Sequence, residues 1–278
     1  MDFQIMILSI ITINYNNREG LRRTIESVVN QTCRDFEYII IDGGSTDGSV
    51  DVIKQYADQI DYWVSEPDKG IYNAMNKGVA VAKGEYCLFL NSGDSLHNNS
   101  ALAKVFEQGF GADIICGTIL TEGNHLLPSP KEVSLGFFYR GSLNHPAAFI
   151  RREWLQRYPY DETLKIVSDR KFFIQALIIG GATYKGIPVI VSYFDGNGVS
   201  SNNILLRGEE NEYVLYSMFP ARVLYDYCVM YGEKDDMHRL FYTLTQWRGG
   251  KWVYTFIVIL LKCLMLNRGW IKSFKINV

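Results

Sequence analysis

The sequence predicts an α/β protein with a mainly parallel, doubly wound sheet flanked by helices. Three observations lead to this prediction. Short apolar runs alternate with helical patterns in the first part of the chain, and the runs are apolar at every position instead of at alternate ones. Strands that helices cover on both faces have this pattern. In addition, 278 residues of which 47% are hydrophobic can bury a large core.

Each element of the predicted sheet can be located from its hydrophobic pattern. Four continuous apolar runs have the length of strands, namely Ile5 to Ile13, Phe36 to Ile41, Ile60 to Val64 and Tyr86 to Leu90. Apolar residues at helical spacing lie between these runs, at Leu21, Ile25, Val28 and Val29, at Val50, Ile53 and Tyr56, and from Ala74 to Ala82. Strands that alternate with helices in this way pair in parallel, because a helix returns the chain between successive strands.

Polar segments follow each of the four predicted strands. In chain order they read ITINYNN, DGGSTDGS, SEPDKG and NSGDS. Each one alone is typical of a turn or a helix N-cap. Together they place five carboxylates at the carboxyl edge of the sheet, where open α/β sheets bind ligands: Asp42, Asp47, Glu66, Asp68 and Asp94. Because this much negative charge destabilises a fold unless a cation offsets it, we expect a ligand site at this edge.

Composition excludes several classes of function. The formal net charge of -2, without a recognised binding motif, argues against nucleic acid as a partner. The charge is uneven, however, since residues 237–278 contain seven Lys or Arg and no Asp or Glu. Five scattered cysteines without a CxxC pair argue against a disulfide framework or a zinc site and fit a reducing compartment. The apolar N-terminus lacks a basic region, so it reads better as a first strand than as a signal peptide.

Four motifs together resemble the nucleotide-sugar-binding half of glycosyltransferase family 2. They are IITINYNN, SVVNQTCRDFEYIIIDGGSTDGS, SEPDKGIYNAMNKG and GEYCLFLNSGD, and they cover about residues 5 to 95 in the family's order. The resemblance implies a GT-A fold and a nucleoside diphosphate sugar as the donor. It also implies a divalent metal, Mg or Mn, and transfer of the sugar with inversion at the anomeric carbon.

The resemblance implies roles for the ends of the first two strands. Thr12, Asn14 and Tyr15 stand where the family packs the nucleoside base. An aromatic face beside amide and hydroxyl groups suits a pyrimidine, so a UDP-sugar is the expected donor. Asp42 matches the first of two acidic positions and is expected to contact the base or the ribose. Gly43 stands where the family more commonly has a second Asp, which leaves uracil specificity open.

The resemblance assigns the diphosphate and its metal to the next two segments. Lys69 is expected to contact the diphosphate through its ammonium, although an exposed turn lysine would look the same in the sequence. The family's metal motif, commonly Asp-x-Asp, reads Asn91, Ser92, Gly93 and Asp94 here, so one carboxylate remains. Asp94 can suffice, because magnesium often takes one or two protein carboxylates and completes its shell with water and substrate phosphates. The alternative makes Asp94 only the N-cap of a helix.

The stretch from residue 140 to 181 resembles the acceptor half of the family. Within it, NHPAAFIRR reads as a strand that leads into a helix. In VSDRKFF, Asp169 matches the Asp of the family's Glu-Asp motif, with Ser168 in place of Glu. Asp169 is the expected general base, because a neutral hydroxyl is a poor nucleophile. The alternative is an N-cap or first-turn carboxylate favoured by the helix dipole. His145 is assigned to the acceptor side, in structure or in binding.

Residues 204–278 resemble the family little and read as a helical extension. The apolar stretch from residue 255 to 266 is too short to span a bilayer, and Lys262 interrupts it. Aromatic residues lie among the seven basic ones, including Trp247, Trp252, Tyr254, Phe256, Trp270 and Phe274. This combination favours peripheral binding to an anionic membrane surface, where each Lys or Arg can add ~1 kcal/mol. The alternative is a helix that packs on the catalytic domain.

These inferences give one domain plan and one predicted function. Residues 1–203 form a GT-A glycosyltransferase domain, with the nucleotide-sugar-binding half at 1–95 and the acceptor half at 96–203, and residues 204–278 form the extension. The predicted function is that of an inverting, hexosyltransferase-type enzyme of surface polysaccharide synthesis, which adds a sugar to a growing, lipid-linked glycan at the cytoplasmic face of the cell membrane. Two alternatives stay open: a nucleotidyltransferase that forms sugar nucleotides, and a non-catalytic module that binds nucleotide sugars or a partner.

Overall fold

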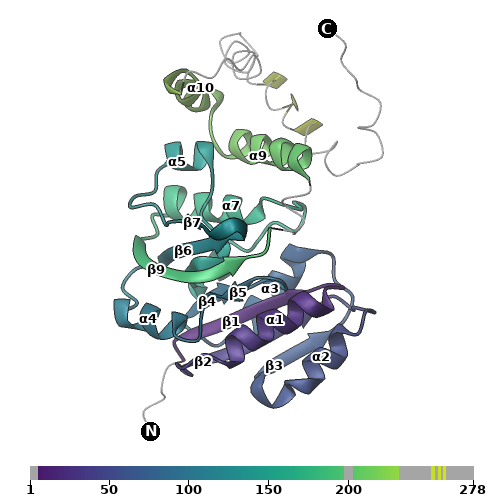
Figure 1. Cartoon of the computed structure of the whole chain (residues 1–278). Helices are drawn as coiled ribbons and strands as arrows, with labels where there is room; N and C mark the ends of the chain where they lie inside the picture. Colours follow the sequence, from purple (N-terminus) through teal and green to yellow (C-terminus); the bar gives the residue numbers. More distant parts are fainter. Residues whose placement is uncertain (1–5, 197–202, 232–251, 254–255, 258, 261–278) are drawn as a thin grey trace. The chain divides into compact units, whose positions relative to one another are not determined.

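The computed structural model describes residues 6–196 and 203–231, together with residues 252–253, 256–257 and 259–260 (Figure 1). The chain divides into two compact units, Met1–Asn202 and Asn203–Val278. The sheet lies in the first unit, and the second unit is helical over most of its described residues. The functional roles that the sequence assigns to these parts of the chain stay predictions.

The first half of the sheet is parallel, as predicted. Its strands lie in the order β3-β2-β1-β4 and are β1 (Leu8–Asn14), β2 (Phe36–Asp42), β3 (Tyr62–Ser65) and β4 (Tyr86–Phe89). The connecting helices are α1 (Arg18–Val29), α2 (Ser49–Gln55), the short 3-10 helix η1 (Ala57–Gln59) and α3 (Ile71–Val81). The four strands and three helices expected from the hydrophobic pattern are therefore confirmed, with ends that shift by a few residues.

The second half of the first unit extends the same sheet. Its strands are β5 (Ser95–Leu96), β6 (Ile114–Thr121), β7 (His125–Leu127), β8 (Ala148–Arg151) and β9 (Tyr184–Phe194). Its helical segments are α4 (Ala101–Gln108), η2 (Glu122–Asn124), α5 (Leu135–Arg140), η3 (His145–Ala147), α6 (Arg152–Arg157), α7 (Ser168–Phe173) and the π-helical turn η4 (Ile174–Ile179). Over the described residues the sheet has nine strands in the order β3-β2-β1-β4-β8-β6-β9-β5, with β7 paired to β6. Its longest ladders, β1 with β2 and β6 with β9, are both parallel.

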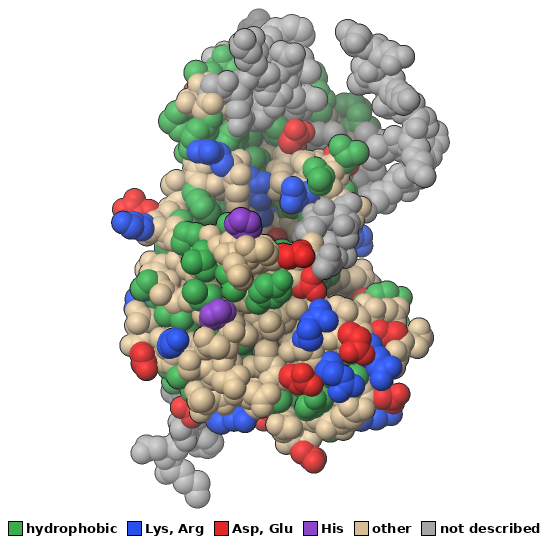
Figure 2. Space-filling model, viewed as in Figure 1, with side chains coloured by type: hydrophobic (Ala, Val, Ile, Leu, Met, Phe, Trp, Pro, Cys, Tyr) green, Lys and Arg blue, Asp and Glu red, His purple; other side chains and the backbone are tan. Residues whose placement is uncertain are grey.

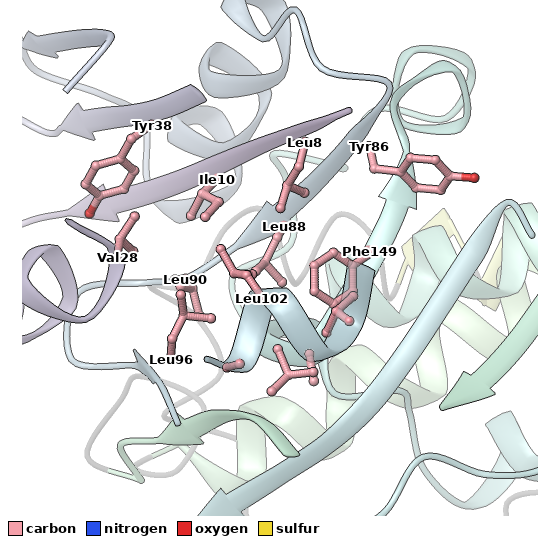
Figure 3. Close-up of a cluster of buried hydrophobic side chains, with 14 of the residues drawn as sticks. Leu8, Ile10, Val28, Tyr38, Tyr86, Leu88, Leu90, Leu96, Leu102 and Phe149 are labelled. Atoms are coloured by element: carbon pink, nitrogen blue, oxygen red, sulfur yellow. The ribbon is translucent and has the colours of Figure 1, made fainter. Parts of the chain in front are cut away.

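Helices cover both faces of β1, which explains why its sequence is apolar throughout. Leu8 and Ile10 belong to one buried cluster, shown in Figure 3 with Tyr38 of β2 and Leu88 of β4, and α1 contributes several residues to it. On the opposite face α3 approaches so closely that a Cβ on Gly78 would lie 2.5 Å from Cγ2 of Ile11. All seven residues of β1 are buried, and a fully buried Leu or Ile contributes about 1.5–3 kcal/mol to folding.

The strand register brings the functional segments to one edge of the sheet. Asn14, Asp42 and Ser65 are neighbours across β1, β2 and β3, each at the carboxyl end of its strand. Beyond β4 the chain continues beside β1, because the Ser92 N–H donates to the Ile13 carbonyl at 3.0 Å. The polar segments after all four parallel strands therefore share this edge, as the sequence predicts.

The second unit contains helices α9 (Ile204–Met218) and α10 (Ala221–Met230). They confirm the predicted helical extension for the residues that are described. No helix within the described ranges is both long and apolar enough to cross a membrane. Trp252 and Phe256 of the predicted membrane-binding set are described, and both are exposed.

Surface charge on the described residues is mixed in sign. Figure 2 shows Lys and Arg side chains lying among Asp and Glu side chains on the face in view. The basic residues from position 237 onward lie outside the described residues: Arg239, Arg248, Lys251, Lys262, Arg268, Lys272 and Lys275. The same holds for Trp247, Tyr254, Trp270 and Phe274. A membrane-binding surface in this region stays a prediction.

Candidate functional site

Asp42 is buried at the carboxyl end of β2 and accepts four hydrogen bonds. Its Oδ1 accepts from Asn14 Nδ2 at 2.7 Å and from the Ser45 hydroxyl at 2.6 Å. Its Oδ2 accepts from the Ser65 hydroxyl at 2.6 Å and from the Ser45 N–H at 2.9 Å. Burial by itself would raise the pKa of Asp42, but these hydrogen bonds together hold it below the ordinary value. The ionised carboxylate ties three strand ends together, so the predicted contact to base or ribose would have to share its oxygens.

Thr12 and Asn14 support the end of β1 from inside the protein. Thr12 is fully buried, and its Oγ1 lies 3.0 Å from the Tyr38 hydroxyl. Thr12 therefore has no exposed atom with which to make its predicted contact with the donor. Asn14 Nδ2 also donates to the Ser45 hydroxyl at 3.1 Å, while its Oδ1 has no hydrogen-bond partner among the described residues. Of the two side chains, Asn14 is the one that could accept a hydrogen bond from a ligand N–H or O–H, through this buried oxygen.

Tyr15 presents an exposed aromatic ring at the same edge. The residue is 67% exposed, although it follows directly on the buried β1. A Cβ built on Gly43 would lie 3.2 Å from Cδ2 of the Tyr15 ring and 2.6 Å from Oδ2 of Asp68. Glycine at position 43 therefore leaves room for the ring on one side and for a carboxylate on the other. Asp68 is fixed in turn, because its Oδ1 accepts from the Gly70 N–H at 2.8 Å.

Lys69 lies on the exposed rim of this edge. Its ammonium has no hydrogen-bond or ion-pair partner within the part of the chain that the structure describes. Its backbone N–H donates to Asn73 Oδ1 at 3.2 Å, so the turn is anchored to α3. A second cation is close, since a Cβ on Gly70 would lie 3.9 Å from the Lys165 ammonium. Two ammonium groups beside the strand ends suit a diphosphate, and the contact from Lys69 stays a prediction.

The loop after β4 follows a path that α1 fixes. The Gly93 N–H donates to Thr24 Oγ1 at 3.0 Å, and the Thr24 hydroxyl donates to the Asp94 carbonyl at 2.6 Å. Asn17 Nδ2 donates to the Ser92 carbonyl at 2.9 Å. Gly93 has a φ of +112°, which glycine adopts without strain. The loop is therefore held in one conformation at the carboxyl edge, where its backbone can approach a ligand.

Asp94 is a buried carboxylate with a second acid beside it. It is 4% exposed, and its Oδ1 accepts from the Asp195 N–H at 3.1 Å. Burial raises the pKa of Asp94 to about 6, although the charge of His145 and the Asp195 N–H act in the opposite direction. Asp195 follows β9, 101 residues further along the chain, and pairs with Arg23 at 3.0 Å. A Cβ on Gly93 would lie 3.2 Å from Asp195 Oδ2, so this carboxylate borders the loop.

The oxygen atoms around Asp94 fit a hard divalent cation. Magnesium and manganese prefer carboxylate, amide and water oxygens. The loop offers the Asp94 carboxylate and Asn91 Oδ1, which is buried and has no hydrogen-bond partner among the described residues, and Asp195 after β9 adds a second carboxylate. Within the described ranges, no group of three or more His, Cys, Asp or Glu side chains could hold a metal by itself. The fit therefore relies on diphosphate oxygens and water to complete the coordination shell.

His145 and Asp169 form a pair that faces the loop after β4. His145 Nδ1 lies 3.4 Å from Asp169 Oδ2, and His145 Nε2 lies 3.2 Å from Asn91 Nδ2. The Tyr72 hydroxyl donates to Asp169 Oδ1 at 3.3 Å. Burial lowers the pKa of His145, but the hydrogen bond and charge of Asp169, with the charge of Asp94, outweigh this and raise it above the ordinary value. Side chains from four separate segments thus meet at one point.

The Asp169 side chain does not cap its helix. Helix α7 begins after Val167, and no side chain caps it. Asp169 lies in the first turn, as predicted, yet its two oxygens approach His145 and Tyr72. Ser168, where the family commonly has Glu, is buried and accepts a hydrogen bond from the Asp161 N–H at 2.5 Å. The structure thus gives Asp169 and Ser168 different surroundings, and the role of Asp169 as a base stays a prediction.

Two residues of this site are not predicted from the sequence, and a third is predicted to lie at this edge without a role. Asp195 ends an apolar strand in the stretch YFDGNG, the same pattern that singled out the other edge carboxylates, and could have been found in that way. Tyr72 carries no sequence signal, because its contact with Asp169 depends on how α3 meets α7. Asp68 was counted among the edge acids, but its position against Gly43 follows from the fold.

The family model and the curated relatives that match this chain all indicate the same family. The model of the family described as Glycosyl transferase family 2 matches residues 9–157. An uncharacterized glycosyltransferase of Mycobacterium tuberculosis (strain ATCC 25618 / H37Rv) is 33% identical over 210 residues, which cover 70% of this chain and 77% of the relative. A PGL/p-HBAD biosynthesis glycosyltransferase of Mycobacterium bovis (strain BCG / Pasteur 1173P2) is 28% identical over 206 residues, which cover 72% and 80%.

Solved structures share the fold. S. aureus TarS 1-349 in complex with UDP-GlcNAc superposes with a TM-score of 0.63 at 20% identity, over 81% of this chain and 67% of that chain. The present chain spans 39% of the chain in another TarS crystal structure. The mannosyltransferase PcManGT from Pyrobaculum calidifontis, in complex with GDP-Man and Mn2+, gives a TM-score of 0.58 at 13% identity over 96% and 88%. At these identities the likeness concerns the fold alone, and it confirms the predicted α/β fold of the GT-A type.

Proposed function

Because the chain belongs to glycosyltransferase family 2, we propose that it transfers a sugar from a UDP-sugar to a growing, lipid-linked glycan with inversion at the anomeric carbon. One observation carries this proposal. The pair of His145 and Asp169 lies against the loop of Asn91 and Asp94, so a candidate base and a candidate diphosphate site are adjacent. An acceptor hydroxyl and a donor sugar could meet between them.

The donor would lie along the carboxyl edge of the sheet. The exposed ring of Tyr15 supplies a face for the base, and the ammonium of Lys69 supplies charge for the diphosphate. Asp42 contributes by holding three strand ends in place through its four hydrogen bonds. The neighbours solved with UDP-GlcNAc and GDP-Man support a nucleotide sugar as the donor class.

A magnesium or manganese ion would be held by Asp94, with Asp195 and Asn91 Oδ1 as further oxygen donors. When bound, such an ion would offset the negative charge of the leaving diphosphate. The chain's own contribution is the loop that α1 fixes, in which Gly93 adopts a φ of +112° without strain. The neighbour solved with Mn2+ supports a divalent metal in this fold.

Asp169 would act as the general base on the acceptor. Its carboxylate takes the proton of the acceptor hydroxyl while the oxygen forms a bond to the anomeric carbon. The bond from that carbon to the diphosphate breaks, and the diphosphate leaves with the electron pair. His145 and Tyr72 contact the two carboxylate oxygens and hold them in one orientation. A single displacement of this kind inverts the anomeric centre and needs no covalent enzyme intermediate.

The proposed setting is surface polysaccharide synthesis at the cytoplasmic face of the cell membrane. The similar PGL/p-HBAD biosynthesis glycosyltransferase supports a glycoconjugate as the product. The basic and aromatic residues after position 237 would attach the enzyme peripherally to anionic lipid, next to a lipid-linked acceptor. The transferred group would be a hexose or a related sugar.

A panel of nucleotide sugars, with and without manganese, tests the proposal through thermal unfolding followed by donor hydrolysis. A ligand at 100 times its dissociation constant stabilises the folded state by ~2.7 kcal/mol, so a binding donor raises the melting temperature measurably. Stabilisation by UDP-sugars with slow release of free sugar is the expected result. Pyrophosphate release from a nucleoside triphosphate would instead indicate a nucleotidyltransferase. Tight binding without hydrolysis or transfer would indicate a non-catalytic binding module.

A further inference from the structure

We propose that Asp68 recognises the nucleobase of the donor by accepting a hydrogen bond from its ring N–H, and so selects uracil over cytosine. This inference rests on the proposed function, because it concerns the base of the nucleoside diphosphate sugar that the site would bind. Asp68 lies in the loop between β3 and α3, a different segment from Asp42.

The fold holds the Asp68 carboxylate at a defined place. Its Oδ1 accepts from the Gly70 N–H at 2.8 Å, a bond that closes a turn just before α3. Its Oδ2 lies 2.6 Å from the position that a Gly43 Cβ would take, and the Tyr15 ring lies 3.2 Å from the same position. A carboxylate oxygen and an exposed aromatic ring therefore border one small space at the carboxyl edge of the sheet.

Three other carboxylates at this edge are already engaged. Asp42 uses both oxygens in hydrogen bonds to strand ends. Asp47 accepts three hydrogen bonds near the starts of α1 and α2. Glu66 pairs with Lys77 at 2.7 Å. Asp68 Oδ2 has no hydrogen-bond or ion-pair partner among the residues that the structure describes, so it is the acceptor left open beside the ring.

The chemistry of this space distinguishes between pyrimidines. A base that lies on the Tyr15 ring turns its hydrogen-bonding edge toward the surrounding side chains. Uracil carries an N–H at ring position 3, which can donate to the Asp68 carboxylate. Cytosine carries a bare lone pair at that position, which would face the negative charge. Because a hydrogen bond to an ionised group is among the strong ones, and a site built around it rejects an analogue without the donor, the site should favour UDP over CDP.

The first arm of the test uses Asp68→Asn. This substitution keeps the shape of the side chain and an oxygen for the Gly70 N–H, but it turns the Oδ2 acceptor into a donor. Calorimetric titration of the full chain with UDP and with CDP should show that the parent prefers UDP by about tenfold or more, the size expected for one charge-assisted hydrogen bond. In Asp68→Asn that preference should disappear. Glu66→Gln removes a charge from the same loop, and this matched control should keep the preference.

The second arm uses the space at Gly43. Gly43→Asp alone should weaken UDP binding, because its Cβ would meet the Asp68 carboxylate. Combined with Asp68→Ala, the new side chain gains that space and can present its own carboxylate beside Tyr15. The double variant should therefore bind UDP more tightly than either single variant. Recovery of this kind is not expected if Asp68 only stabilises its turn.

The outcomes distinguish the role of Asp68 from the proposed function. Loss of the UDP preference in Asp68→Asn, together with recovered UDP binding in the double variant, supports the role of Asp68. If Asp68→Asn melts well below the parent, UDP binding by the double variant decides whether Asp68 has this role. A parent that prefers CDP, a well-folded Asp68→Asn that keeps the UDP preference, or a double variant no better than Asp68→Ala overturns it while leaving the proposed function standing. A parent that binds no nucleoside diphosphate at all overturns both.

Discussion

Replacing Asp94 by Asn is expected to stabilise the metal-free protein at neutral pH. The parent residue is 4% exposed, and burial raises the pKa of its carboxyl from 3.8 to about 6. At about 1.36 kcal/mol per pKa unit, keeping this group ionised costs the folded state up to ~3 kcal/mol above pH 6. Asn has almost the same shape, and its oxygen can still accept from the Asp195 N–H.

The sign of the effect follows from proton binding. The folded state holds the Asp94 proton more tightly than the unfolded state does, so this group adds stability at low pH and the contribution is lost as the pH rises from about 4 to about 6. Asn has no proton to lose. The variant and the parent should therefore unfold with similar free energies near pH 4, whereas at pH 7 the variant should be more stable by up to ~3 kcal/mol.

Urea unfolding followed by circular dichroism, at several pH values and with EDTA present, measures this difference. The raised pKa of His145 lowers stability further as the pH rises above 6.5 in the parent, so the comparison between the two proteins at each pH is what counts. A variant that is less stable than the parent at pH 7, or a difference that does not change with pH, would show that the buried Asp94 carboxylate does not destabilise the fold. The same variant should lose any increase in UDP affinity that manganese causes, because it lacks the carboxylate that would hold the metal beside the diphosphate.

Three further predictions concern the general base, the contact to the diphosphate and the residues after Lys234. Asp169→Asn should leave UDP binding intact and slow sugar transfer about 100-fold or more, as expected when a general base is lost, and unchanged turnover would remove Asp169 from that role. Lys69→Ala should weaken UDP binding roughly 3- to 10-fold without affecting uridine, with a smaller effect at high salt, and equal losses for both ligands would place Lys69 away from the diphosphate. A chain that ends at Lys234 should bind UDP normally but sediment less with anionic vesicles; equal sedimentation of both forms would contradict the membrane proposal, and an unfolded truncation would indicate a packed helix.

The parallel half of the sheet could be predicted because its hydrophobic pattern is local. β1 and β4 are buried on both faces, so their sequences are apolar at every position and stand out from the polar segments that follow. The same logic places Asp42 and Asp94 at one edge of the sheet. Asp169 was placed at a helix start by its motif, and the structure confirms that position in α7.

The remaining features depend on contacts between distant segments. Asp195 reaches Asp94 only because β9 pairs in parallel with β6 and ends near the loop after β4. Asp68 lies beside Gly43 because the loop after β3 packs on the loop after β2. Thr12 looks like an edge residue in the sequence, yet its side chain turns inward to Tyr38. Residue types indicate which atoms are available, whereas the fold decides which of them stay open to a ligand.

The stereochemistry of sugar release is a direct test of the inverting mechanism. The full chain is incubated with the UDP-sugar that stabilises it most, an α-linked donor such as UDP-glucose, and the anomer first released is followed by proton NMR. A single displacement directed by Asp169 predicts the β-anomer as the initial product, appearing before mutarotation, and predicts that Asp169→Asn slows its release strongly. Initial release of the α-anomer would contradict the inverting mechanism and the role of Asp169 in it.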